Sequence, residues 1–465
     1  MSSRRILPAA CAWALLATSP GVRGGEDDWP QWRGPAQDGV SNAAGLPTTW
    51  GPEQNIVWKC AMPSWSGSTP ILWGDRIFLV SPSAVDAETL DKHAEEQRKR
   101  AEEGGNQGGR RRGGSRGGRH PGGETMQLLC LSKQDGKLLW TQPLDSGNKL
   151  HMKGNNASPS PVTDGEHVWA VAGTGAVTAF DMDGKRVWAR NLQDDYGEFG
   201  HQWGYACSPL FYEGKLIVEV LHGSHTDEPS YVVAFDAASG KPVWKVDRPT
   251  DAPRESPDAY TTPLLLKHAG QAQIVISGGD CVTGHDPDSG KELWRVRGLN
   301  PRGASNYRIV ASPLAAGGMI YAPTRVQPLL AIRLDDEVRP GDDDVAWKWD
   351  DRGGPDVPTP ACDGSLFYMV SDSGMATCLD AKTGAVIWGP ERTAQGSVSS
   401  SPLLADGKLY FTNEEGVTVV LAAGKEFKLL AQNELDGSYT LSSPVASGKR
   451  LYIRTQDYLY CIGDQ

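Results

Sequence analysis

The sequence predicts an all-β fold, an eight-bladed β-propeller with four-stranded blades, and three observations predict it. A Ser-Pro or Thr-Pro dipeptide followed by apolar residues recurs eight times along the 465 residues. A short segment rich in β-branched and aromatic residues follows most copies. Most copies then carry a turn that ends in Gly and, four residues later, a Trp, as in "SGKPVW". Four strands in a unit of 42–54 residues is the period of propeller blades.

The first strand of each unit begins at the dipeptide. A proline near the start of a strand removes a backbone donor where pairing has only begun. Successive prolines are 91, 48, 54, 50, 47, 42 and 42 residues apart, so the first unit carries an insertion. The prolines are Pro70, Pro161, Pro209, Pro263, Pro313, Pro360, Pro402 and Pro444.

The third strand often ends in a small residue, an apolar residue and Asp, as in "TAFD", before the turn and the fourth strand. The Asp can hold the turn by bonding nearby backbone N–H groups. The Gly permits a positive φ in a tight hairpin. The Trp, on the outermost strand, can bury a large flat surface against the next blade.

The small position of the third strand calls for a buried residue, and a free Cys behaves as a small hydrophobe. We therefore expect free thiols there. The alternative is a bridge between Cys60 and Cys461, on strands that ring closure would place side by side. The residues at this position include Cys130, Ala179, Ala234, Cys378 and Cys461.

The last unit, "SSPVASGKRLYIRTQDYLYCIGDQ", stops after three strands. Near the start of the chain, "NIVWKC" (Asn55–Cys60) looks like a fourth strand with its Trp, ahead of the first dipeptide. We therefore expect this N-terminal strand to complete the last blade. Closure of the ring removes an open sheet edge that would otherwise aggregate.

The chain divides into four parts. Residues 1–24 have Arg4 and Arg5 before an apolar run, the form of a secretory signal peptide, so we expect a periplasmic or secreted protein. Residues 25–54 form an N-terminal arm and residues 55–465 the propeller. Within blade 1, residues 84–123 are an insertion, a charged helix followed by a Gly/Arg-rich disordered stretch. No segment is long and apolar enough to predict a transmembrane helix.

The charge is uneven. The net charge is −11, to which residues 1–24 contribute +3 and residues 86–124 contribute +1, which leaves −15 for the rest. An acidic body disfavours nucleic acid and anionic membranes as partners.

The repeats "AFDAASGKPVW" and "GHDPDSGKELW" resemble those of the PQQ-like, quinoprotein-dehydrogenase-like β-propellers. With the opening "WPQWRGPAQDGVS", they resemble exported propellers described by similarity to the outer-membrane assembly factor BamB family. The resemblance covers about residues 29–465 without the insertion. It implies an exported, non-catalytic propeller, a scaffold for a protein partner or an extracellular ligand in envelope or outer-membrane protein assembly. Blade 5 departs from the repeat by a longer turn, and blade 7 lacks the Trp.

A second interpretation is a PQQ- and calcium-dependent quinoprotein dehydrogenase acting on alcohols or sugars. Many such enzymes carry adjacent cysteines against the quinone, and this chain has no Cys-Cys pair. The sequence also shows no convergent catalytic set, so we expect neither catalytic residues nor a bound cofactor. A third interpretation, a polysaccharide hydrolase or lyase with His201 as base, has less support.

The mouth of the central channel is the usual ligand site of a propeller. Loops just before each first strand point to one mouth. Their aromatic, basic and acidic side chains suit a sugar, a quinone or a peptide, and the alternative is that they only plug the channel. They are Trp65, Asn156, Trp203, Tyr205, Asp258, Tyr260, Tyr307, Arg308, Asp356 and Tyr439.

Two further features each have two interpretations. In blade 3, His201, His222 and His225 could bind zinc or copper, although propeller loops often carry scattered histidines. In the arm, "WPQWRGP" supplies Trp29 and Trp32. We expect these indoles to pack along the propeller, and the alternative is a docking arm for a partner.

Overall fold

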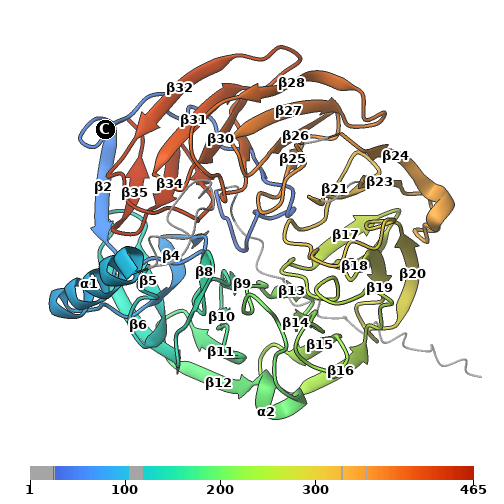
Figure 1. The fold of residues 1–465 in the computed structure, drawn as a ribbon, viewed down its shortest axis with the longest axis horizontal. Helices are drawn as coiled ribbons and strands as arrows, with labels where there is room; N and C mark the ends of the chain where they lie inside the picture. Colours follow the sequence, from blue (N-terminus) through green and yellow to red (C-terminus); the bar gives the residue numbers. More distant parts are fainter. Residues whose placement is uncertain (1–24, 26, 104–118, 326–327, 352, 465) are drawn as a thin grey trace, which may run out of the picture.

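Eight β-sheets stand around a central channel like the blades of a propeller (Figure 1). The structure is a computed structural model that describes residues 25, 27–103, 119–325, 328–351 and 353–464. The predicted all-β, eight-bladed fold with four-stranded blades is confirmed. The signal-peptide prediction for residues 1–24 lies outside the described residues, as does the Gly/Arg-rich stretch between residues 104 and 118.

Each blade runs from an inner strand at the channel to an outer strand at the rim, with antiparallel neighbours throughout. The strands of blades 1 to 4 are β3 (Ile71–Trp73), β4 (Arg76–Pro82), β5 (Thr125–Ser132) and β6 (Leu138–Ser146); β9 (Val162–Thr163), β10 (His167–Val171), β11 (Ala176–Asp181) and β12 (Arg186–Asn191); β13 (Leu210–Tyr212), β14 (Lys215–Val220), β15 (Tyr231–Asp236) and β16 (Pro242–Asp247); and β17 (Leu264–His268), β18 (Gln271–Gly278), β19 (Cys281–His285) and β20 (Glu292–Arg297).

The strands of blades 5 to 8 follow the same order. They are β21 (Leu314–Ala316), β22 (Met319–Ala322), β23 (Leu329–Arg333) and β24 (Val345–Trp349); β25 (Ala361–Cys362), β26 (Leu366–Val370), β27 (Met375–Asp380) and β28 (Val386–Arg392); β29 (Leu403–Ala405), β30 (Lys408–Thr412), β31 (Val417–Ala422) and β32 (Leu429–Glu434); and β33 (Val445–Ser447), β34 (Arg450–Arg454), β35 (Tyr458–Ile462) and the N-terminal β2 (Ile56–Ala61).

The strand β2 is the outer strand of blade 8. It pairs antiparallel with β35, with Trp58 opposite Cys461 and Cys60 opposite Leu459. Chain segments about 400 residues apart thus share one sheet. Both Cys60 and Cys461 are free thiols in the structure.

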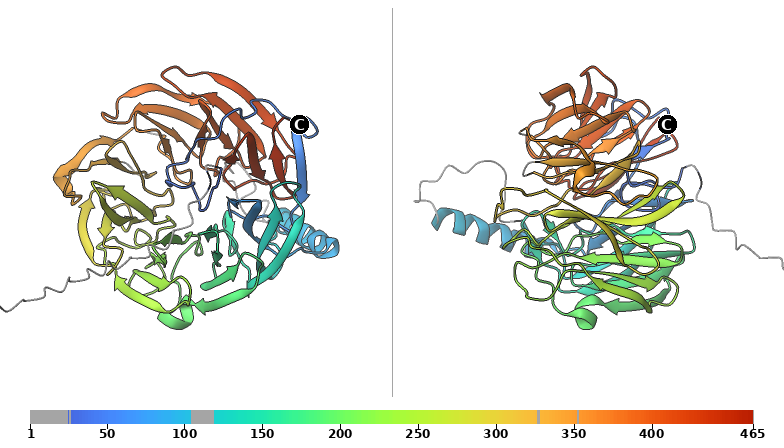
Figure 2. Two further views of the ribbon diagram at one scale, coloured as in Figure 1. Left: turned by 180° about the vertical axis from the view of Figure 1, so that it is seen from behind. Right: turned by 90° about the vertical axis from the view of Figure 1, so that its right-hand side faces the viewer.

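A few elements lie outside the blades. The helix α1 (Ala87–Glu103) leaves blade 1 between β4 and β5 and stands beyond one face of the disc (Figure 2, right view). Its ion pairs Lys92–Glu88 and Lys99–Glu95 are exposed (i, i+4) pairs. The others are the hairpin β7 (Leu150–His151) and β8 (Gly154–Asn155), the short helix α2 (Leu192–Tyr196) and the 3₁₀ turn η1 (Asp342–Asp344).

The Ser or Thr of each Ser/Thr-Pro dipeptide belongs to a closed circle of hydrogen bonds around the channel. In every blade its backbone N–H donates to the side-chain hydroxyl of the equivalent residue in the next blade, over 2.9–3.2 Å. The last link runs from Ser443 in blade 8 to Thr69 in blade 1. We call this set the hydroxyl ring: Thr69, Ser160, Ser208, Thr262, Ser312, Thr359, Ser401 and Ser443.

The rim has its own contact between blades. The outer-strand Trp of one blade donates its indole N–H to a carbonyl in the hairpin turn of the next blade, as Trp188 does to Ala237 at 2.8 Å. The same indole covers the turn glycine, and a Cβ on Gly240 would lie 2.6 Å from Trp188. The turn therefore needs Gly for two reasons, the positive φ of 69° and the closeness of the indole. Such bonds are made by Trp58, Trp140, Trp188, Trp244, Trp347 and Trp388.

Register explains the small position of the third strand. In seven blades it lies directly opposite the Trp of the fourth strand, as Ala179 lies opposite Trp188. At Gly284, a Cβ would lie 2.0 Å from Trp294. Cys130 and Cys378 occupy this position as buried free thiols.

Blade 7 lacks the rim Trp, and its neighbour explains why. In blade 8 the third and fourth strands, β35 and β2, are not joined by a hairpin turn. Blade 8 therefore has no turn carbonyl that could accept an indole N–H from blade 7. The opposed pair is reversed in size there, with Val420 facing Ala431. The arm fills the space instead, because Trp50 packs on Tyr410 and its backbone N–H donates to the Asn433 side-chain oxygen.

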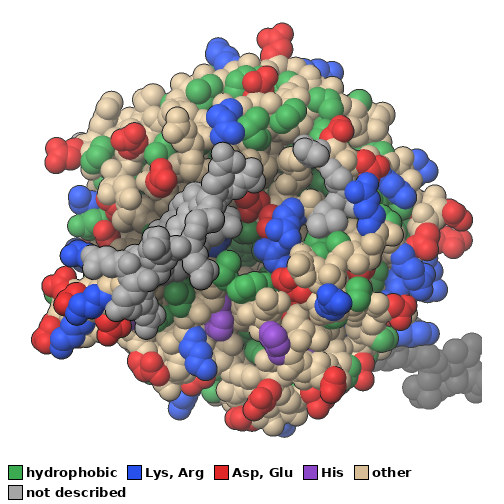
Figure 3. Space-filling view, in the orientation of Figure 1, with side chains coloured by type: hydrophobic (Ala, Val, Ile, Leu, Met, Phe, Trp, Pro, Cys, Tyr) green, Lys and Arg blue, Asp and Glu red, His purple; other side chains and the backbone are tan. Residues whose placement is uncertain are grey.

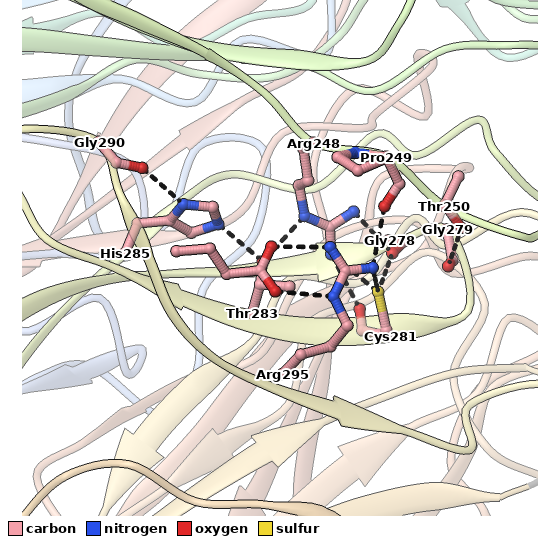
Figure 4. Close-up of polar contacts among 11 residues, drawn as sticks. Arg248, Pro249, Thr250, Gly278, Gly279, Cys281, Thr283, His285, Gly290 and Arg295 are labelled. Atoms are coloured by element: carbon pink, nitrogen blue, oxygen red, sulfur yellow. Dashed lines mark hydrogen bonds and ion pairs between the residues drawn. The ribbon is translucent and has the colours of Figure 1, made fainter.

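Two fully buried arginines bind neighbouring blades together, and neither forms an ion pair with an acid of the described residues. Arg248 follows β16 of blade 3 and donates to Gly278, Cys281 and Thr283 in blade 4 (Figure 4). Arg454 in blade 8 donates to five atoms of the segment Ser64–Ser81 of blade 1. Burial lowers the pKa of Arg454 to about 9.

The N-terminal arm crosses the face opposite α1 and enters the channel (Figures 1 and 2). The Arg33 guanidinium donates to the carbonyls of Pro360 and Pro402, and the Gln37 amide donates to the carbonyl of Pro263. These prolines directly follow hydroxyl-ring residues. Burial lowers the pKa of Arg33 to about 10. The strand β1 (Val40–Ser41) then pairs parallel with β29 of blade 7.

Thr359→Val tests one link of the hydroxyl ring. Valine keeps the shape but removes the hydroxyl, which leaves the buried N–H of Ser312 without its acceptor. We expect the free energy of unfolding in urea to fall by about 1–3 kcal/mol. Thr359→Ser keeps the hydroxyl and is expected to cost less than the Val variant. Equal losses in the two variants would show that the hydroxyl contributes nothing.

Arg454→Met tests the contact between blades 8 and 1. The substitution leaves several buried acceptors unpaired, so we expect a loss of about 2–4 kcal/mol in unfolding free energy. Arg450→Met, on the same strand but only half-buried, is the matched control and should cost below about 1 kcal/mol. Similar losses at both positions would contradict a special role for Arg454.

Candidate functional site

A cavity of about 710 Å³ occupies the channel above the arm. Loops that precede first strands line it, and these loops share a face with the β4–β5 connection that carries α1. The same face is hollowed at its centre in the space-filling view, where basic and acidic side chains gather (Figure 3). All eight hydroxyl-ring residues line this cavity. Trp32 reaches it from the arm, beside Arg33. The ring and the arm together therefore shape its inner end.

One wall carries a paired charge cluster. Arg308 bonds Asp356 through both terminal nitrogens, at 3.0 and 3.1 Å, and its Nε lies 3.6 Å from Glu255. Arg325 lies 3.4 Å from the same Asp356. Burial opposes the Arg308 charge, but Asp356 outweighs it and the pKa of Arg308 is raised. Glu255 also accepts the indole N–H of Trp203 at 2.8 Å, which fixes this aromatic ring in the wall.

A second charge pair lies across the cavity. Lys153, in the turn between β7 and β8, bonds Glu414 at 2.6 Å and Ser399 at 3.2 Å. The Ser399 hydroxyl donates to the same Glu414 oxygen. The Tyr439 hydroxyl donates to the carbonyl of Lys153. This pair joins the blade 2 hairpin to blade 7.

Two carboxylates hold the loops of the mouth, the fully buried Asp258 and the half-buried Asp372. Asp258 accepts the backbone N–H groups of Gln202 and Ser224, and Asp372 accepts those of Asp356 and Val357. Burial raises the pKa of both acids. Their oxygens are used to position the neighbours of Trp203 and Arg308, so these acids shape the cavity through the loops.

The structure separates the ten residues predicted for the mouth. Trp203, Tyr260, Arg308 and Asp356 line the cavity. Trp65 and Tyr439 pack edge to face beside it, with ring centres 5.4 Å apart. Asn156, Tyr205, Asp258 and Tyr307 are buried beneath the loops.

The buried four have partners within the protein. Asn156 bonds the His151 ring at 2.8 Å. Tyr205 stacks on Phe199 and donates to the carbonyl of Glu219. The Tyr307 hydroxyl bonds Thr324. Their chemistry is used inside the fold rather than at the cavity.

The three histidines of blade 3 lie close together but differ in setting. His201 and His222 are buried with ring centres 5.6 Å apart, and burial lowers the pKa of both, to about 3 for His201. His225 lies at a smaller surface pocket with Arg254. Within the described ranges, no group of three or more His, Cys, Asp or Glu side chains is arranged to hold a metal ion.

Sequence reasoning did not assign several residues of the cavity. Lys153 lies in the same loop before β9 as the predicted Asn156, Arg325 lies between β22 and β23, and Glu414 approaches from the turn after β30. The motif "WPQW" predicts that Trp32 packs on the propeller, but it contains no local signal that the arm enters the channel. The hydroxyl ring was visible only as the Ser or Thr of a repeated dipeptide.

PQQ with calcium is the alternative occupant, and the cavity does not fit this pair. PQQ carries carboxylates that need free cations, while Arg308 is matched by Asp356 and Glu255, and Lys153 is matched by Glu414. Calcium needs six to eight oxygen ligands. The cavity acids are engaged instead with arginines and backbone N–H groups, as described above.

Comparison with known proteins gives a family match and several relatives. A family model described as "Outer membrane protein assembly factor BamB" matches residues 99–201 and 228–464. BamB of Alkalilimnicola ehrlichii is 27% identical over 42% of this chain, and the match spans about half of that relative's length (51%). Tetrathionate hydrolase of Acidithiobacillus ferrooxidans is 24% identical over 71% of this chain and 67% of its own. Quinohemoprotein alcohol dehydrogenase ADH-IIG of Pseudomonas putida is 29% identical over 34% of this chain and 21% of its own.

Solved structures share the fold. BamB from Moraxella catarrhalis has a TM-score of 0.55 at 13% identity, over 74% of this chain and 95% of its own. A europium-containing methanol dehydrogenase has a TM-score of 0.62 at 14% identity, over 92% of this chain and 89% of its own. At these identities the likeness concerns the fold alone.

Glu219 predicts a pH dependence of stability. This acid of β14 is fully buried, accepts the Thr261 hydroxyl at 2.8 Å, and burial raises its pKa to about 8 from 4.5. As pH rises, the unfolded chain therefore loses this proton at a lower pH than the folded protein does. The contribution of Glu219 to the free energy of unfolding then falls between about pH 4.5 and about pH 8, by up to about 1.4 kcal/mol per pH unit.

Urea unfolding at several pH values checks this, with Glu219→Gln as the comparison. We expect the difference in unfolding free energy between the variant and the natural protein to grow in favour of Gln through that window, then level off. A difference that stays constant with pH would mean that Glu219 titrates normally in the folded protein.

Proposed function

Because this chain belongs to the family described as outer membrane protein assembly factor BamB, we propose that it is a non-catalytic propeller scaffold acting in outer-membrane protein assembly. The family match carries the proposal, because it covers nearly three quarters of the chain. We place the protein in the periplasm or outside the cell, as the sequence of residues 1–24 predicts and as relatives named for outer-membrane assembly support.

The fold suits a scaffold. Blades are joined at the channel by the hydroxyl ring and at the rim by the Trp–turn contacts, so loops on both faces are held on a rigid frame. Among the described residues, no helix combines the length and apolar character needed to cross a bilayer. Partners on this proposal are envelope proteins that dock on the loops, or an extracellular ligand, and nucleic acid is not among them.

A quinoprotein dehydrogenase acting on alcohols or sugars with PQQ and calcium is the second candidate function. The relative named quinohemoprotein alcohol dehydrogenase favours it, over about a third of this chain. The paired charges of the cavity oppose it, as described above. We therefore rank the scaffold first.

Crosslinking in cells that make the protein tests the scaffold. A photo-crosslinking residue is placed at Gln202, exposed on the mouth face, and separately at Asp75, exposed in the β3–β4 turn of the opposite face. We expect one of the two positions to capture an outer-membrane barrel protein or a component of its assembly machinery. The position on the other face, which is expected to give no such crosslink, then serves as the control. Capture of neither class from either face would contradict the proposal.

Addition of PQQ and calcium to the purified protein tests the second candidate. We expect no stoichiometric quinone spectrum and no dye reduction with alcohols or aldose sugars. A bound quinone together with turnover would replace the scaffold by the dehydrogenase.

A further inference from the structure

The hydroxyl ring retains hydrogen-bonding capacity on the cavity side. A Ser or Thr hydroxyl has one donor and two acceptor lone pairs. In the ring, each oxygen accepts one backbone N–H, and in the part of the chain that the structure describes none of the eight hydroxyls donates to a protein acceptor. Each ring residue also lines the cavity. The cavity therefore offers a circle of groups that can both donate and accept.

Two indoles stand next to this circle. Trp32 and Trp203 line the cavity and are only half-buried. Trp203 is held at both ends, since its indole N–H donates to Glu255 and its backbone N–H donates to the Tyr260 hydroxyl. Within the described ranges, neither indole lies in a ring contact with another aromatic side chain. Each is thus a flat apolar surface beside hydroxyl groups.

Each cation that lines the cavity is paired with an acid. Three cations and three acids line it: Lys153, Arg308, Arg325, Glu255, Asp356 and Asp372. The cations are already in ion pairs at 2.6–3.6 Å, with Glu414 as the partner of Lys153. A strongly charged ligand would have to break such a pair in a half-buried setting, which costs free energy. A neutral ligand with many hydroxyl groups would not.

We propose that this cavity binds a neutral carbohydrate, with one face of a sugar ring against Trp203 or Trp32 and its hydroxyl edge in the hydroxyl ring. A sugar ring combines an apolar C–H face with hydroxyls that donate and accept, and the cavity presents both partners. The volume of about 710 Å³ lies within the usual range of small-molecule sites, about 300–1,000 Å³, and suits a short oligosaccharide. The proposal goes beyond the scaffold role and does not depend on it.

Calorimetric titration of the full chain tests the proposal with maltotriose, cellotriose and tri-N-acetylchitotriose. We expect at least one to bind, with a Kd that changes by less than about twofold when NaCl rises from about 50 to about 500 mM, because no net charge is neutralised. Trigalacturonate and triglycine are the comparison ligands. The proposal is overturned if none of the three neutral trisaccharides binds. It is also overturned if only trigalacturonate or triglycine binds.

Variants locate the site. Trp203→Ala removes a platform without touching the hydroxyl ring, and we expect it to weaken binding at least about tenfold. Thr262→Val should do the same, while Thr262→Ser, which keeps the hydroxyl, should stay within about twofold. Val243→Ala, an exposed change on the outer strand of blade 3, is the control and should bind normally. Melting temperatures identify any variant that fails to fold, and unchanged affinity in folded Trp203→Ala overturns the proposed site.

Discussion

At the channel, each blade of this propeller donates one backbone N–H to the next blade and accepts one from the previous blade through a hydroxyl. This circle of hydrogen bonds has to close after eight blades. Residues as distant as Thr69 and Ser443 are thereby linked directly. The circle explains why Ser or Thr, and no other residue, precedes each of the eight repeat prolines, since the side chain must accept a hydrogen bond and must be small enough to lie at the axis. The following carbonyls then face the arm, where Arg33 and Gln37 use those of Pro263, Pro360 and Pro402. The cavity is the space left above this layer.

The rim obeys a related rule with different chemistry. In six blades the outer-strand indole donates to the turn of the next blade, and a small third-strand residue lies opposite each of these indoles. In five of these contacts the indole also lies against the turn glycine, where a Cβ would clash with it. Blade 4 differs because Trp294 bonds Gln273 of its own blade, next to the longer turn of blade 5. Blade 7 differs because blade 8 offers no turn. Both departures from the repeat thus follow from what the neighbouring blade presents.

The local sequence predicts the fold because the constraints on each blade are local: the dipeptide, the turn glycine and the Trp lie within one unit. The local sequence predicts much less of the candidate site. Trp203 and Tyr205 are two residues apart in one loop, yet one lines the cavity and the other is buried on Phe199. Lys153 and Glu414 meet across 261 residues. Such choices depend on packing between blades, and the path of the arm into the channel depends on carbonyls that only the closed ring brings together.

Hydrogen exchange of the eight hydroxyl-ring amides tests the central claim most directly. Mass spectrometry with residue-level fragmentation can follow these backbone N–H groups together. If the circle is a single cooperative unit, all eight exchange at one slow rate that reports global opening of the ring, including the Ser443 amide that joins the last blade to the first. Fast exchange at some of these amides while the others stay protected would contradict it, because the blades would then open one at a time.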